Sequence, residues 1–156
     1  MEDHEWLKAA KALSPGMLQV AMGLLRHQAD AEDAVQQALV NVWEKRRRIA
    51  PEKFRAYMMR TVINECRNIQ RRRLRVSPVA EMPMVIAPEN RGLTELIGAI
   101  NALPDSLRLP LWLKYLEDFS EKEAAAALRI PVTTLRSRLH RARKILRKNF
   151  DWEVML

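Results

Sequence analysis

A break between two helical stretches near residue 130 constrains the fold of this chain more than any other feature. Ser120 is followed three residues later by Glu123, which is the pattern of a capping box, and the alanine-rich run to Leu128 favours a helix. Pro131 disfavours the α conformation in the residue before it and cannot lie inside a helix without removing a backbone hydrogen bond. The sequence therefore predicts a helix that Ser120 caps and that runs to Leu128, a turn at 129–131 and a new helix from about residue 132.

The second of these helices combines an apolar stripe with dense positive charge. Its apolar residues recur at helical spacing: Leu135, Leu139, Ala142 and Leu146. Its other sides carry arginine and lysine, and no acidic residue occurs between Ala124 and Phe150. Charge of one sign along a whole helix repels itself and favours an anionic partner, although an ordinary solvated surface is the alternative interpretation.

A short helix, a three-residue turn and a longer basic helix form the arrangement that lays the second helix in a DNA major groove. Residues in its first turns can reach base edges, and later cations are better placed for phosphates. The predicted DNA-contacting residues of this helix are Thr133, Thr134, Arg136, Ser137, Arg138, His140, Arg141 and Arg143.

Composition narrows the class of protein. A length of 156 residues allows one domain or two small ones, and a formal charge of +8 with a pI near 10.1 indicates a polyanionic partner. No apolar run approaches the roughly 20 residues of a membrane span and no signal-peptide pattern occurs, so we expect a cytoplasmic protein with no membrane insertion. One cysteine, three scattered histidines and the lack of a carboxylate pair or phosphate loop predict no metal, no cofactor and no enzymatic activity.

The pattern before residue 76 predicts a helical domain. An amphipathic lead over 1–13 is followed by a helix that Ser14 and Pro15 cap and that runs to about residue 27. The next helix is expected to begin at Asp30 and to end in a run of three arginines at 46–48. Its expected inward face is Val35, Leu39, Val42 and Trp43.

A longer helix is predicted over 52–74. Its expected buried side is Phe54, Met58, Met59, Val62, Ile63, Cys66 and Ile69. A second face mixes cations and amides with an aromatic ring, which suits a nucleic-acid strand whose bases are free to stack, although arginine and asparagine also occur on ordinary helix surfaces. The residues of this face are Tyr57, Arg60, Asn64, Arg67, Asn68 and Arg71.

The remaining pattern divides the chain in two. Residues 76–92 contain three prolines and no lysine, which is typical of an extended linker. Helical spacing resumes after Leu93, and Pro110 is expected to kink the helix that follows Pro104. The predicted fold is therefore all-α, with a domain over 1–75, a linker over 76–92 and a helix-turn-helix domain over 93–156.

Three segments together resemble the extracytoplasmic-function (ECF) sigma factors of bacterial RNA polymerase: DAEDAVQQALVNVWEK (30–45), FRAYMMRTVINECRNIQRRR (54–73) and ALPDSLRLPLWLKYLEDFSEKEAAAALRIPVTTLRSRLHRARKIL (102–146). Their most specific parts are DAEDAVQQ and TTLRSRLHRAR, in that order and at that separation. The resemblance implies a factor that directs core polymerase to promoters and aids strand opening. It also implies contact with the polymerase flap region and an anti-sigma factor, which could hold the protein at the membrane.

The resemblance assigns roles to particular positions. The helix that begins at residue 30 matches the one that docks on the clamp helices of the polymerase largest subunit, and 54–73 matches the segment that melts and reads the minus-ten element. The basic helix matches the one that recognises the minus-thirty-five element. The residues that the resemblance assigns to core polymerase are Asp33, Val35, Gln36, Gln37 and Asn41.

Some positions depart from the family pattern, and two other functions remain open. Gln37 replaces a common acid, Leu39 a common aromatic, Tyr57 a frequent tryptophan and Arg129 a common glycine, while Pro110 is unusual. One alternative function is a stand-alone helix-turn-helix regulator, which would bind DNA tightly without polymerase, usually as a dimer. The other is a sigma-like decoy for an anti-sigma factor, whose DNA faces should have lost their cations.

Overall fold

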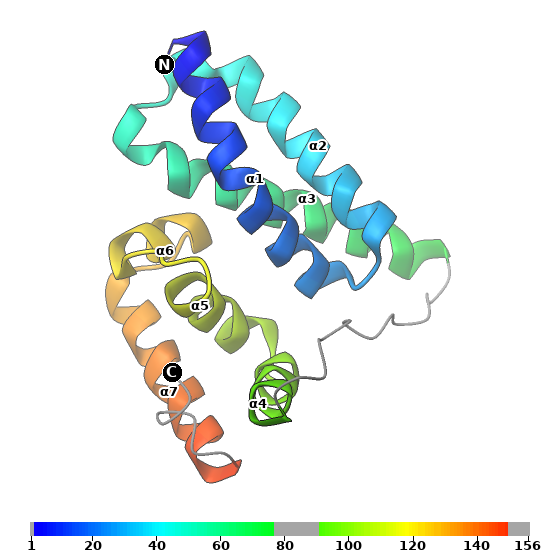
Figure 1. Cartoon of the computed structure of the whole chain (residues 1–156), viewed down its shortest axis with the longest axis vertical. Helices are drawn as coiled ribbons and strands as arrows, with labels where there is room; N and C mark the ends of the chain where they lie inside the picture. Colours follow the sequence, from blue (N-terminus) through cyan, green and yellow to red (C-terminus); the bar gives the residue numbers. More distant parts are fainter. Residues whose placement is uncertain (1, 77–90, 150–156) are drawn as a thin grey trace. The chain divides into compact units, whose positions relative to one another are not determined.

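A computed structural model of the chain describes residues 2–76 and 91–149. All regular secondary structure in those ranges is helical, which confirms the predicted all-α class. The chain divides into two compact units, Met1–Pro83 and Met84–Leu156 (Figure 1). Most of the predicted linker lies outside the described residues, and its described ends are helical, because the third helix reaches Val76 and the fourth begins at Arg91. None of the helices in the described ranges is long and apolar enough to cross a bilayer.

The first unit packs three long helices against one another: α1 (Asp3–Leu25), α2 (Gln28–Lys45) and α3 (Phe54–Val76). Two single-turn 3-10 helices, η1 (Arg46–Arg48) and η2 (Pro51–Lys53), connect α2 to α3. The predicted buried side of α3 is confirmed, because every one of its seven residues is buried: Phe54, Met58, Met59, Val62, Ile63, Cys66 and Ile69.

The predicted division of the N-terminal stretch into a lead and a capped helix is wrong. α1 is one continuous helix with Pro15 inside it. The Ser14 hydroxyl does not cap a helix start but donates to the Ala10 carbonyl at 2.6 Å. A proline inside a helix costs about 3 kcal/mol. This cost is offset by packing, because Ala10 and Met17 on either side of the proline are both buried in the core.

The prediction for α2 needs two corrections. The helix begins at Gln28, two residues before Asp30, because His27 is the N-cap and its Nδ1 accepts from the Asp30 amide at 3.4 Å. Trp43 is not in the core. It is 36% exposed, with its ring edge-on to Trp6 at 4.8 Å between centroids. The buried face of α2 is instead rich in small residues, which lets neighbouring helices approach closely: Ala31, Ala34, Val35, Ala38 and Val42.

The end of α3 is fastened to the end of α1. Gln70 donates through Nε2 to the Leu24 carbonyl at 3.1 Å, and Arg73 donates to the Leu25 carbonyl at 3.3 Å and pairs with Asp30. These contacts satisfy carbonyls that the last turn of a helix leaves without intrahelical partners. The Arg73 side chain is therefore occupied inside the first unit.

The second unit contains α4 (Arg91–Asn101), α5 (Asp105–Tyr115), α6 (Glu121–Leu128) and α7 (Val132–Asn149). α7 packs against α5, α6 and α4, and the apolar stripe predicted for it is buried throughout. α5 is continuous through Pro110, whose ring is buried. The core of this unit includes Leu96, Leu109, Leu113, Leu135, Leu139 and Leu146.

Candidate nucleic-acid interface

The turn between α6 and α7 has the geometry that a helix-turn-helix needs. The predicted capping box at the start of α6 is present: the Glu123 amide donates to Ser120 Oγ at 3.0 Å, and the Ser120 amide donates to the Glu123 carboxylate at 3.1 Å. At the other end Arg129 has φ 56° and ψ 46°, the left-handed conformation that glycine usually supplies. Its amide donates to the Ala126 carbonyl at 3.3 Å, and the Ile130 amide to that of Ala125 at 3.0 Å. The turn thus holds a bulky residue without being reshaped.

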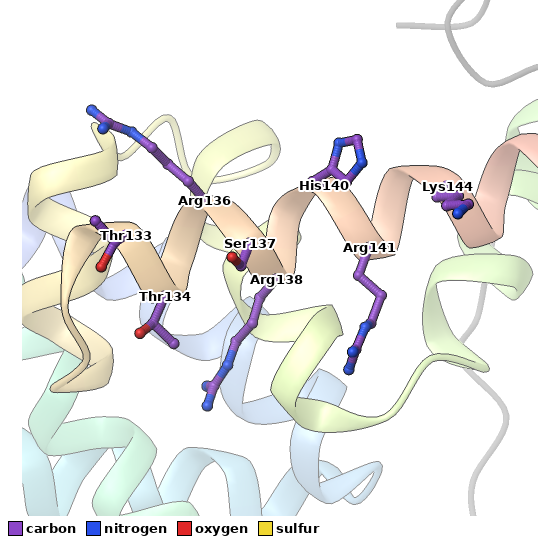
Figure 2. Close-up of a pocket in the computed structure, with 8 residues that line it drawn as sticks. All are labelled: Thr133, Thr134, Arg136, Ser137, Arg138, His140, Arg141 and Lys144. Atoms are coloured by element: carbon purple, nitrogen blue, oxygen red, sulfur yellow. The ribbon is translucent and has the colours of Figure 1, made fainter.

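Burial of the apolar stripe turns the opposite side of α7 outward. Seven of the eight predicted DNA-contacting residues, together with Lys144, line one shallow concave surface along this helix (Figure 2). Figure 2 shows Arg138 and Arg141 extending to one flank of α7 and Arg136 to the other. Lys144 was not among the predicted residues, although its position three and four residues after Arg141 and His140 places it on the same face.

Arg143, the eighth predicted residue, lies at the edge of this face. Its Nε donates to the Tyr115 hydroxyl of α5 at 2.9 Å, Nη2 makes a second bond to the same oxygen, and the side chain is half-buried. Arg143 therefore helps to fasten α7 to α5. Its predicted contact with DNA stays a prediction.

Arg136 also has a partner within the unit. Its Nε donates to Glu121 Oε2 at 2.7 Å, and the other oxygen of the same carboxylate accepts from Lys114 Nζ at 3.1 Å. Hydrogen bonds from Arg136 and then Lys114 hold the pKa of Glu121 below its ordinary value. By contrast, Arg138, Arg141 and Lys144 make no hydrogen bond or ion pair with any other described residue.

The polar face predicted on α3 is present in the first unit. Asn64, Arg67, Asn68 and Arg71 are exposed, while Tyr57 and Arg60 are half-buried. The Arg60 guanidinium lies 4.8 Å from the centroid of the Tyr57 ring, a cation–π distance. The face therefore presents an aromatic ring with a cation beside it, followed by amides and further cations toward the end of the helix.

A hydrogen-bond chain joins this face to the polar side of α2. Gln37 donates through Nε2 to Asn41 Oδ1 at 2.9 Å, and Asn41 donates through Nδ2 to Glu65 of α3 at 3.0 Å. A second shallow surface, lined by Gln37, Glu65, Asn68, Arg71 and Arg72, lies across the two helices. Helical spacing could not predict the place of Glu65 on this surface, because its partner Asn41 lies 24 positions away in the sequence.

The residues predicted to bind core polymerase do not all share one surface. Asp33, Gln36 and Gln37 are exposed on α2, and Asn41 is half-buried through its bond to Glu65. Val35 is only 8% exposed and packs inside the first unit, so its side chain is not available to a partner in this structure.

Comparisons with known proteins agree with this architecture. The family model described as Sigma-70 region 2 matches residues 9–76, and that described as Sigma-70, region 4 matches residues 93–146. The chain is 27% identical over 154 residues to the ECF RNA polymerase sigma factor SigE of Mycolicibacterium smegmatis, covering 91% of this chain and 60% of that protein. It is 28% identical over 155 residues to the RNA polymerase sigma-E factor of Streptomyces antibioticus, covering 94% of this chain and 85% of that one.

Solved structures give the same result. The sigma factor RpoE of Bartonella quintana, crystallised with the anti-sigma factor NepR, superposes with a TM-score of 0.75 at 26% identity, covering 90% of this chain and 93% of that one. CnrH, solved with the cytosolic domain of CnrY, superposes with a TM-score of 0.68 at 23% identity and shares the fold. The models for Sigma-70 regions 2 and 4 match in order along one chain, and ECF sigma factors are among its relatives, so the chain belongs to the sigma-70 family as an extracytoplasmic-function sigma factor.

Proposed function

We propose that this chain directs bacterial core RNA polymerase to specific promoters and aids strand opening there. The observation that carries the proposal is the presence of two separate outward faces suited to nucleic acid, one on α7 and one on α3, in a chain of this family. A decoy that only captured an anti-sigma factor would have no use for the cations of either face. As a polymerase subunit, the chain would work in the cytoplasm and would need no catalytic residue of its own.

The domain over 93–156 would recognise the minus-thirty-five element. The threonines, Ser137 and Arg136 of the first turns of α7 would meet base edges, since the N-terminal part of a recognition helix enters the major groove. Arg138, Arg141 and Lys144 have no partner among the described residues and would meet phosphates, to which most protein–DNA hydrogen bonds go. The same domain would also meet the polymerase flap region.

The domain over 1–75 would bind polymerase and capture unpaired bases of the minus-ten element. Tyr57 would stack on a base and the exposed amides and cations of α3 would follow the strand, since stacking is worth about 1–3 kcal/mol per base. Unstacking a base costs a few kcal/mol. These contacts would form only in the open state, where they would offset that cost. Asp33, Gln36 and Gln37 on the neighbouring α2 would dock on the clamp helices of the largest subunit.

An anti-sigma factor is the further partner that we propose. The Bartonella RpoE structure contains such a factor, NepR. In this chain the proposed polymerase-binding surface and the proposed base-capturing surface adjoin through the Gln37–Asn41–Glu65 chain of hydrogen bonds. One partner lying across α2 and α3 would therefore cover both surfaces together.

The test is transcription by purified core polymerase on fragments of the source genome, with and without this chain. We expect defined transcripts only when the chain is present, and sequencing their starts gives both promoter elements. The variant Arg141→Ala should weaken initiation, while Lys8→Ala, which removes an exposed cation from α1, serves as the matched control. Tight sequence-specific binding by the free chain, with no transcription by the mixture, would identify a stand-alone regulator instead.

A further inference from the structure

The Glu121 carboxylate connects three helices of the second unit behind the base-reading end of α7. It lies at the first position of α6 and binds Lys114 of α5 through one oxygen and Arg136 of α7 through the other. The Lys114 and Glu121 side chains are 27% and 30% exposed, whereas the Arg136 side chain is 66% exposed. In the Glu121–Arg136 pair the carboxylate is thus the more buried group, and the guanidinium faces outward.

The position of Glu121 in its helix and its two hydrogen bonds keep the carboxylate ionised and in place. A negative charge in the first turn of a helix is favoured by the helix dipole, and Glu121 is the first residue of α6. The hydrogen bonds from Arg136 and Lys114 hold its pKa below the ordinary value. Glu121 is therefore a charged acceptor at neutral pH.

The contact with Glu121 uses only Nε of Arg136 and leaves its two Nη atoms available. A guanidinium has five N–H donors in a rigid plane, and only the one on Nε is given to Glu121. The four donors on the two Nη atoms make no bond with any other described residue. A bidentate contact with O6 and N7 of guanine requires two such donors held in one plane.

We propose that Glu121 is a positioning residue that holds Arg136 in the orientation needed to read a guanine of the upstream promoter element. This inference rests on the proposed function. An arginine side chain carries about 2 kcal/mol of rotamer entropy. If a carboxylate already holds the guanidinium in the free chain, less of this entropy is lost when the arginine binds a base. Arg138 and Arg141 have no such support, which suits contacts with phosphates, where orientation matters less.

The proposal gives Glu121 opposite effects on affinity and on discrimination. A carboxylate near DNA repels phosphates, so the change Glu121→Gln should leave binding to unrelated DNA equal or tighter. The same change removes the ion pair and weakens the hold on Arg136, so preference for guanine at the base pair that Arg136 reads should fall by about two- to fivefold, the range expected of an exposed ion pair. A residue that only stabilised the fold would weaken binding to every sequence.

The experiment measures initiation by holoenzyme on a library in which each base pair of the minus-thirty-five element is varied. The chains compared are wild type, Glu121→Gln, Arg136→Ala and the double variant, with Glu95→Gln on α4 as the control for loss of one negative charge. We expect Arg136→Ala and Glu121→Gln to change preference at the same base pair, and the double variant to be no worse than Arg136→Ala. Unchanged preference with Glu121→Gln, beside a change with Arg136→Ala, would overturn the inference and leave the proposed function intact.

Two further measurements separate the ways in which the inference can fail. The Arg136 Nε–H signal in nuclear magnetic resonance spectra of the free chain should show a hydrogen-bonded proton. Glu121→Ala should remove it, because alanine has no acceptor, whereas glutamine keeps one acceptor oxygen. Persistence of the signal in Glu121→Ala would refute the contact itself. If Arg136→Ala changes no base preference, Arg136 does not read a base and the role proposed for Glu121 is wrong as well. If wild-type holoenzyme initiates nowhere, the proposed function itself is wrong.

Discussion

Replacing Arg129 by glycine tests whether the turn between α6 and α7 holds conformational strain. Arg129 has φ 56° and ψ 46°, and its amide and that of Ile130 satisfy carbonyls at the end of α6. For an L-residue with a Cβ atom this conformation costs about 1–2 kcal/mol, because Cβ approaches the following carbonyl oxygen. Glycine adopts it freely and can make the same two backbone hydrogen bonds.

The expected gain is smaller than the strain, because glycine also frees the unfolded chain. That freedom costs about 0.4–1 kcal/mol. Subtracting it from the strain leaves Arg129→Gly more stable by about 0.5–1 kcal/mol in the second unit. Local stability of this size corresponds to amide exchange in α6 and α7 that is about two- to fivefold slower.

The assay is hydrogen exchange of the α6 and α7 amides in the full chain. Arg129→Ala is the matched control, because it removes the same charge and keeps the Cβ atom, so it should give no gain. Equal protection in the alanine and glycine variants would show that relief of charge repulsion, and not backbone conformation, is responsible. Faster exchange in Arg129→Gly would refute the strain argument.

Four further predictions concern partners, stability and chemical reactivity. Arg141→Ala should lower the slope of log affinity against log salt by about 0.9, the value for one lost phosphate contact. Arg143→Ala should lower this slope too, and in thermal unfolding it should also lower the melting temperature, because Arg143 bonds to Tyr115. An unchanged melting curve would contradict this structural role. Gln36→Ala should weaken association with core polymerase in pull-down assays and leave DNA binding by the second domain intact. Burial raises the pKa of the Cys66 thiol to about 12, so iodoacetamide at pH 8 should modify it only after unfolding, as mass spectrometry would show.

Features that depend on a few neighbouring residues could be predicted from the sequence. The Ser120–Glu123 capping box requires only a spacing of three, and both of its hydrogen bonds are present. The buried side of α3 follows the helical period and is complete. The outward face of α7 was predicted in the same way, because burial of one stripe leaves the opposite side exposed.

Features decided by packing could not be predicted in this way. Pro15 should end a helix by its local preference, yet burial of Met17 and its neighbours keeps α1 continuous. Trp43 has the spacing of a core residue, but the small residues of α2 fill that face and place the ring at its edge. The contact of Asn41 with Glu65 spans 24 positions, a separation about which helical periodicity carries no information.

Two arginines of α7 have side-chain acceptors within the second unit, whereas three other cations of this helix have none among the described residues. Arg136 and Arg143 lie seven residues apart, nearly two helical turns, and each has an acceptor on α6 or α5. Arg138, Arg141 and Lys144 have none among the described residues, and α7 contains no acid of its own. Under the proposed function, promoter DNA would relieve the repulsion among these cations, and such phosphate contacts give affinity without sequence preference. Under the proposed function, sequence preference would come from the first turns of α7, where Glu121 limits the freedom of Arg136.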